Sequence, residues 1–257
     1  EIHERLVGSE MCIRDRYNLQ YILDDGFVTI DEIKDLKGKL PKGTYALTYG
    51  NLPWAFMSLL YGAGGTLEND MDDLTKDVWR KPMEKLKEAY DAGVIAPMDV
   101  DGEQAFGSGK AVFAQLGTWA QGNMSNTLGA DKIAEANTLQ YSADNPVNFF
   151  YQCNWMQLKD PHRSAAKSAA AADFVKYVYE HWMDWSEVGS ISPAYRDLNN
   201  PEYQKLIQAS FTNSKKERDY IKTSNYLYGG YATAGWGTYN DIVYGNVGLE
   251  EGLKTLD

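Results

Sequence analysis

Hydrophobic positions recur along this chain with two different periods, which predicts both helices and strands. A helical period predicts amphipathic helices at residues 77–92, ending at Gly93, and at 164–182. Alternating or short apolar runs predict strands at 44–48, 111–116 and 149–158. Less regular helices are predicted at 53–61, 104–109, 131–136, 201–211 and 236–256, the last broken near 245–248. Because strands and helices alternate, the fold class is α/β.

Two local signals fix the ends of predicted helices. Thr29 with Glu32 three residues later has the pattern of a capping box, which starts a short helix. The glycine-rich stretch at 62–65 is too short for a dinucleotide fingerprint, so we interpret it as a helix-ending turn. Three tryptophans on predicted helices are expected to pack in the core, namely Trp79, Trp182 and Trp185.

The first sixteen residues, EIHERLVGSEMCIRDR, have no clear helical or alternating period and no apolar segment of a signal peptide. They resemble a translated adaptor at the end of a reading frame, and a disordered natural N-terminus is the alternative. We therefore exclude residues 1–16 from the fold. Cys12 is excluded with them, which leaves Cys153 and no intramolecular disulfide.

Composition and charge narrow the function. The chain has 257 residues, 44% of them hydrophobic, and a formal net charge of −11. This acidic balance argues against binding the phosphate backbone of nucleic acids. No run of about 18 apolar residues is present, so no membrane-spanning helix is predicted.

Enzyme and metal chemistry find little support. His162 and His181 lie at the start and near the end of the predicted helix at 164–182, nearly 30 Å apart by helical rise, so they do not share a site. The acidic residues at 68–73 lack the glycine and distal glutamate of a calcium loop, and a solvated surface before a helix is preferred. We predict no metal and no cofactor. Paired carboxylates of a glycoside hydrolase remain an alternative, although the pattern selects no pair.

Three tryptophans stand beside turn signals. Trp54 follows Pro53, Trp119 follows Gly117, and Trp236 stands between two glycines. Exposed aromatic rings of this kind stack on the C–H face of a pyranose, while amides such as those of Asn51 and Gln121 bind its hydroxyls. Core packing is the alternative for each tryptophan. These positions are our candidate ligand-binding residues.

Several motifs, taken in order, resemble the extracellular solute-binding proteins of bacterial ABC importers, the group that includes maltose-binding protein. The segments concerned are Thr-Ile-Asp-Glu-Ile at 29–33, Tyr-Asp-Ala-Gly-Val-Ile-Ala-Pro at 90–97, Ala-Phe-Gly-Ser-Gly-Lys-Ala at 105–111 and Ala-Ala-Asp-Phe-Val at 171–175. The third is the most specific, and it leads through a predicted strand to Gly117 and Trp119. The resemblance covers residues 17–257 and implies a non-enzymatic protein with two α/β lobes (type II) and a ligand cleft between them.

The resemblance also implies boundaries. Residues 17–151 and 222–257 form the second, C-terminal lobe, and 152–221 form the helical part of the first lobe. Most of the N-terminal lobe sheet is missing from the chain, so the fold is expected to be incomplete. The resemblance further implies that the isolated chain exposes the apolar faces of Phe174, Val178 and Trp182.

The resemblance supports Trp54, Trp119 and, less securely, Trp236 as ligand-stacking aromatics. At the second lobe crossing, Tyr151-Gln152 stands where the family usually has a glycine pair, and this adds Tyr151 and Trp155 as weaker candidates. Arg196 is a loose candidate for binding an anionic ligand.

The expected ligand is a carbohydrate, a di- or oligosaccharide, delivered to the membrane permease of an ABC importer. The protein is expected to be a monomer on the extracellular or periplasmic side, with a lipid anchor as an option. A non-sugar cargo and a glycoside-degrading enzyme are the alternatives.

Overall fold

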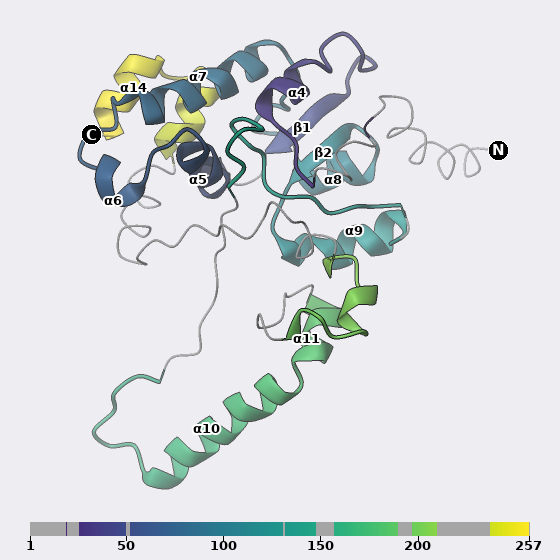
Figure 1. Cartoon of the computed structure of the whole chain (residues 1–257), viewed down its shortest axis with the longest axis vertical. Coiled ribbons are helices and arrows are strands. Elements are labelled where there is room, and N and C mark those ends of the chain that lie inside the picture. Colours follow the sequence, from purple (N-terminus) through teal and green to yellow (C-terminus); the bar gives the residue numbers. More distant parts are fainter. Residues whose placement is uncertain are drawn as a thin grey trace, which may run out of the picture.

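The computed structural model describes residues 19, 26–49, 52–130, 132–147, 157–189, 197–209 and 237–256 of the chain. Figure 1 shows a body of helices around a small sheet, with α10 (Ala165–Glu180) and α11 (Trp182–Gly189) lying apart from most of it. The buried hydrophobic cluster of this body contains residues between 19 and 139 and between 239 and 253, and none from α10 or α11.

The sheet contains two parallel strands. β1 (Tyr45–Tyr49) pairs with β2 (Ala111–Gln115), and Tyr45 lies opposite Ala111. An isolated parallel bridge joins Leu47 to Ile95. The strands predicted at 44–48 and 111–116 are confirmed to within one residue at each end, whereas most of the strand predicted at 149–158 lies outside the described residues.

Helices α5 (Leu52–Gly62) and α7 (Asp77–Asp91) pack against each other beside the sheet. A stack of three aromatic rings joins them to the helix at 237–243: Phe56 and Tyr239 have centroids 5.2 Å apart, and Phe56 and Trp79 6.0 Å. Trp79 is fully buried, which confirms its predicted role in the core. The predicted C-terminal helices are also confirmed, with α14 (Leu249–Leu256) following the break at 244–248.

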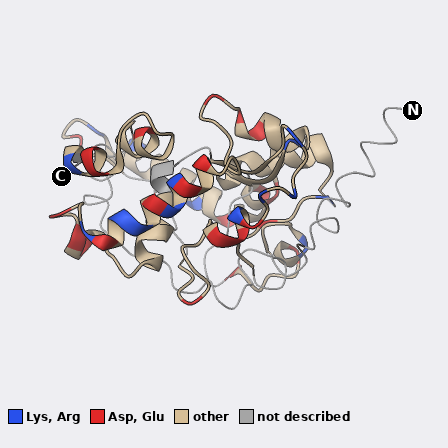
Figure 2. Ribbon diagram, turned by 90° about the horizontal axis from the view of Figure 1, so that it is seen from above, with Lys and Arg blue, Asp and Glu red and all other residues tan. Residues whose placement is uncertain are grey.

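The capping box predicted at the start of α4 (Ile30–Lys34) is confirmed. The Glu32 backbone N–H donates to the Thr29 hydroxyl at 3.2 Å, and the Thr29 backbone N–H donates to Glu32 Oε2 at 2.7 Å. Two ion pairs join α4 to α7, Lys34 with Glu88 at 2.5 Å and Lys85 with Asp31 at 2.7 Å. Figure 2 shows such acidic and basic residues side by side over the body.

The glycine-rich stretch after α5 forms the helix-ending turn that the sequence predicts. Gly64 has φ +89°, a conformation that side chains disfavour, and the Gly65 N–H donates to Leu60 O at 3.0 Å. A side chain at Gly65 would overlap Leu60 and Val78. Glycine at positions 64 and 65 therefore favours the turn of the chain toward α6 (Leu67–Asp70).

Three predicted helices need correction. Residues 132–139 form no helix, and residues 137–140 instead run beside 26–30, with the Asn137 N–H donating to Gly26 O at 2.8 Å. At 201–208 the chain forms turns and the 3-10 helix η3 (Tyr203–Lys205), since Asn200 Oδ1 accepts from Glu202 N–H and Leu206 is extended. The helix predicted at 164–182 ends at Glu180, and α11 follows as a separate helix.

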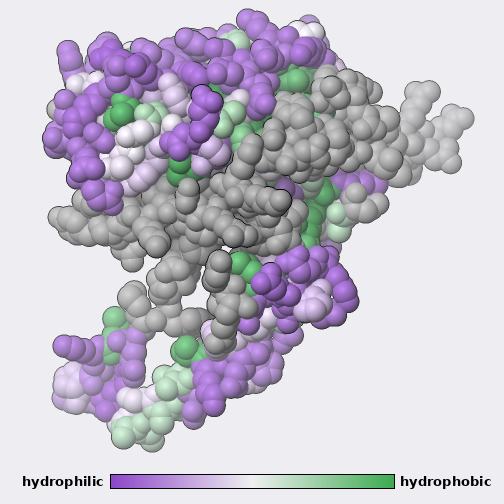
Figure 3. All heavy atoms as spheres, in the orientation of Figure 1, coloured by the Kyte–Doolittle hydropathy of each residue, from purple (hydrophilic) through white to green (hydrophobic). Residues whose placement is uncertain are grey.

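Helix α10 has no buried residue. Phe174 is 54% exposed, as predicted, while Val178 and Trp182 are half-buried. Trp185 on α11 is 45% exposed, so its predicted role in the core is wrong. In Figure 3 the lower part of the molecule, where α10 lies, carries hydrophobic residues on its surface.

Candidate functional site

The carboxyl ends of β1 and β2 meet at one edge of the parallel sheet, because Tyr49 pairs with Gln115. From this edge the chain leads into α5 after β1, and into the 3-10 helix η1 (Thr118–Ala120) after β2. Ligands of open α/β sheets bind outside the carboxyl ends of the strands. The first turn of α5 and η1 are therefore the places to look for ligand-binding side chains.

Trp119 lies in the middle of η1 with its indole ring against Gly117. A side chain at Gly117 would overlap that ring, so the glycine lets the indole lie close to the backbone. Trp119 is nevertheless 57% exposed. A broad aromatic surface held in this way, beside the ligand-binding edge of the sheet, suits stacking on the apolar face of a sugar.

Gln121 begins α9 (Gln121–Leu128), two residues after Trp119. Its Nε2 donates to Gln208 Oε1 at 3.0 Å, and its Oε1 is buried with no hydrogen-bond partner among the described residues. This predicted ligand residue therefore keeps an acceptor atom that a ligand could use.

The other candidates stay predictions. Trp54 belongs to the first turn of α5, where the structure describes the backbone but not the Trp54 side chain. Four further site candidates, and the anion candidate at position 196, lie outside the described residues: Asn51, Tyr151, Trp155, Trp236 and Arg196. From the predicted set, the structure describes the side chains of Trp119 and Gln121, which are two residues apart along the chain.

The helix at 237–243, which follows Trp236, packs against the helix that carries Trp54. Phe56, two residues after Trp54, stacks on Tyr239, three residues after Trp236. This contact packs the two helices together in the core, and the roles of Trp54 and Trp236 stay predictions.

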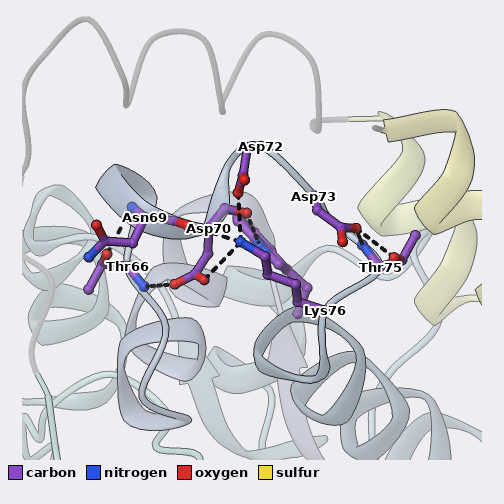
Figure 4. Close-up of polar contacts among 8 residues, drawn as sticks. Thr66, Asn69, Asp70, Asp72, Asp73, Thr75 and Lys76 are labelled. Carbon is purple, nitrogen blue, oxygen red and sulfur yellow. Dashed lines mark hydrogen bonds and ion pairs between the residues drawn. The ribbon is translucent and has the colours of Figure 1, made fainter.

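The acidic residues before α7 are paired with a lysine and with backbone groups. Figure 4 shows Lys76 Nζ among them, at 2.6 Å from Asp72 Oδ1 and 3.0 Å from Asn69 O. The hydrogen bond from Lys76 holds the pKa of Asp72 below its ordinary value. In the described part of the chain, no three His, Cys, Asp or Glu residues gather as a metal ion would require.

Two further polar residues at the site, Gln208 and Ser186, are not predicted from the sequence. Gln208 is fully buried, and its Nε2 donates to Ser186 O at 2.7 Å. Gln208 bonds to Gln121 across 87 residues of sequence, and it lies in the segment 201–211, for which the sequence predicts a helix. No periodic pattern signals such a contact.

Comparison with known proteins gives the family. The model of the bacterial extracellular solute-binding protein family matches residues 17–210, and the chain belongs to this family. A comparison with curated protein sequences found no match. No helix among the described residues is long and apolar enough to cross a membrane.

Solved structures similar to this chain include three proteins named for sugars or sugar-like ligands. The first is the cyclic α-maltosyl-1,6-maltose-binding protein of Arthrobacter globiformis, with 15% sequence identity and a TM-score of 0.62. The second is the GacH receptor of Streptomyces glaucescens, solved with acarbose, with 17% identity and a TM-score of 0.65. The third is the maltose/maltodextrin-binding domain of Bdellovibrio bacteriovorus bound to maltotriose, with 13% identity and a TM-score of 0.63.

These matches cover 92%, 92% and 90% of this chain and 66%, 65% and 64% of the other chains, in the same order. They confirm the predicted periplasmic-binding-protein-like α/β fold. The chain spans less than two thirds of each structure, in agreement with the expectation that the fold is incomplete.

Proposed function

We propose that this protein is the substrate-binding component of an ABC importer and that it binds a carbohydrate, a di- or oligosaccharide. The observation that carries the proposal is Trp119, an exposed indole held against Gly117 beside the carboxyl edge of the sheet. The ligands named for the structurally similar proteins are maltose-like sugars and acarbose, which supports a sugar ligand.

The remaining parts of the proposal follow from the family. Residues 17–151 and 222–257 form one lobe and residues 152–221 belong to the other, with the ligand bound between them. The separation of the buried cluster from α10 and α11 supports this division. The protein works as a monomer outside the cytoplasmic membrane and passes its ligand to the permease without chemical change.

Titration with sugars tests the proposal directly. Maltose, maltotriose and acarbose are added to the full chain while tryptophan fluorescence is recorded, and chromatography checks that each sugar is recovered unchanged. Saturable fluorescence change without turnover is expected. Turnover would favour a glycoside-degrading enzyme, and no binding to a wider sugar panel would favour a non-sugar cargo.

Trp119→Ala is expected to weaken binding of the responding sugar by about 1–3 kcal/mol, the range for loss of an aromatic anchor. Gly117→Ala should also weaken binding, because the added methyl group displaces the indole. Tyr177→Ala, which removes an exposed aromatic ring from α10, and Gly248→Ala, which adds a methyl group in open space, are the matched controls. Unchanged affinity in Trp119→Ala would remove Trp119 from the site.

A further inference from the structure

A small polar junction connects the body of the protein to the part that contains α11. The junction consists of Gln121 at the start of α9, Ser186 on α11 and Gln208 after η3. Gln121 Nε2 donates to Gln208 Oε1 at 3.0 Å, and Gln208 Nε2 donates to Ser186 O at 2.7 Å. The backbone is also close here, since a Cβ added to Gly122 would lie 3.9 Å from Val188 O.

Two buried polar atoms of the junction, Gln121 Oε1 and Ser186 Oγ, have no hydrogen-bond partner in the part of the chain that the structure describes. Ser186 is only 1% exposed. Leaving a buried acceptor and a buried hydroxyl unpaired costs free energy, and native proteins contain few such groups. A ligand that enters the junction would pair both atoms, and Gln121 follows Trp119 by two residues along the chain.

The chemistry of the junction indicates what kind of ligand would pair these atoms. Gln121 Oε1 only accepts a hydrogen bond, whereas the Ser186 hydroxyl can donate or accept. Among the described residues, no charged side chain makes a hydrogen bond with the three junction residues. This composition favours neutral hydroxyl groups over a carboxylate or a phosphate, which would call for a charged partner.

We propose that the junction is a hydroxyl-binding part of the ligand site, in which Gln121 Oε1 and Ser186 Oγ bind hydroxyl groups of a neutral sugar stacked on Trp119. The sugar reaches these atoms when α9 and α11 separate, and the junction then closes around it. Ser186 thereby becomes a specificity-determining residue from the second part of the chain. This inference rests on the proposed sugar-binding function.

Ser186→Ala tests the inference, with Ser168→Ala as the matched control, because both serines lie inside helices and Ser168 is on the distant α10. The full chain is titrated with maltose and maltotriose by calorimetry. For the sugar that binds, Ser186→Ala should lower the affinity about three- to tenfold, the range for one neutral hydrogen bond, and Ser168→Ala should leave it unchanged. A monodeoxy analogue that lacks the contacted hydroxyl should bind the parent chain and Ser186→Ala equally weakly.

A ligand-free measurement separates this role from a structural one. Without sugar, Ser186→Ala should unfold at the same denaturant concentration as Ser168→Ala or at a higher one, because it removes an unpaired hydroxyl. A lower midpoint would show that the hydroxyl is already bonded in the free protein, which overturns the inference. Sugar binding with equal affinity in Ser186→Ala and the parent chain also overturns it and leaves the proposed function intact. If the parent chain binds no sugar, the proposed function fails and the inference fails with it.

Discussion

Burial raises the pKa of Glu135 to about 7 from an ordinary value of 4.5. Loss of hydration is the cause, because the charged form loses more than the neutral form when the side chain leaves water. In the unfolded chain this carboxyl group ionises near its ordinary pKa. The folded state therefore loses stability from Glu135 as the pH rises from about 4.5 to about 7, and the loss is complete above pH 7.

Glu135→Gln removes this titration and gives a prediction at the scale of one residue. At pH 8 the variant should be more stable than the parent chain by about 2 kcal/mol, a value reduced from the full linkage energy because the group is partly solvated. At pH 5 the difference should largely disappear. Urea unfolding at both pH values measures it, with the exposed Glu187→Gln as control. A difference that grows toward low pH would contradict the raised pKa.

Single residues also show what the sequence could reveal about the site. The sequence predicts that tryptophans on helices pack in the core. This prediction is confirmed for Trp79 and wrong for Trp185 on α11, which is exposed. At Trp119, where the sequence shows a turn signal at Gly117, the indole ring is exposed and lies against Gly117. The contacts of Gln121 could not be predicted, because they depend on Gln208 in a distant part of the chain.

At the scale of elements, the start of α4 depends on the reciprocal cap between Thr29 and Glu32. Thr29 is buried, and it precedes Ile30 and Ile33, which pack in the core. Thr29→Ala should therefore lower the free energy of unfolding by about 1 kcal/mol, the usual cost of losing an N-cap. Urea unfolding checks this value. Thr127→Ala on the exposed side of α9 should change stability by less than about 0.5 kcal/mol, and equal effects of the two variants would argue against the cap.

Elements with strong local signals were predicted well, and elements set by distant contacts were not. The cap of α4, the glycine stop after α5 and the amphipathic stripe of α7 are all local, and their bounds match the structure closely. The helix predicted at 131–136 is absent from the described residues 132–136, and the chain directly after them, at 137–140, pairs with residues 26–30. Backbone pairing between segments more than a hundred residues apart leaves no mark in a local period.

At the scale of the whole molecule, the chain combines a well-buried body with a helix that buries nothing. Fully buried Phe56, Trp79 and Tyr239 join three helices in the body. Along α10, by contrast, Phe174, Tyr177 and Tyr179 are 54%, 59% and 47% exposed. An amphipathic helix is stabilised mainly by packing its apolar side, so α10 depends on contacts that the described residues do not supply.

This difference predicts how the isolated chain behaves with a hydrophobic dye. The chain should bind 8-anilinonaphthalene-1-sulfonate in its folded state, because contiguous exposed apolar side chains form dye-binding surface. Phe174→Ser should reduce the dye fluorescence while the unfolding midpoint of the body stays unchanged, since Phe174 is outside the buried cluster. Met98→Ser, a similar change at a 57% exposed residue in a turn, is the control and should leave dye binding largely intact. Low dye binding by the parent chain, or a marked loss of stability in Phe174→Ser, would mean that α10 is packed. The separation of residues 152–221 from the body would then have to be abandoned, because a packed α10 joins both parts into one core.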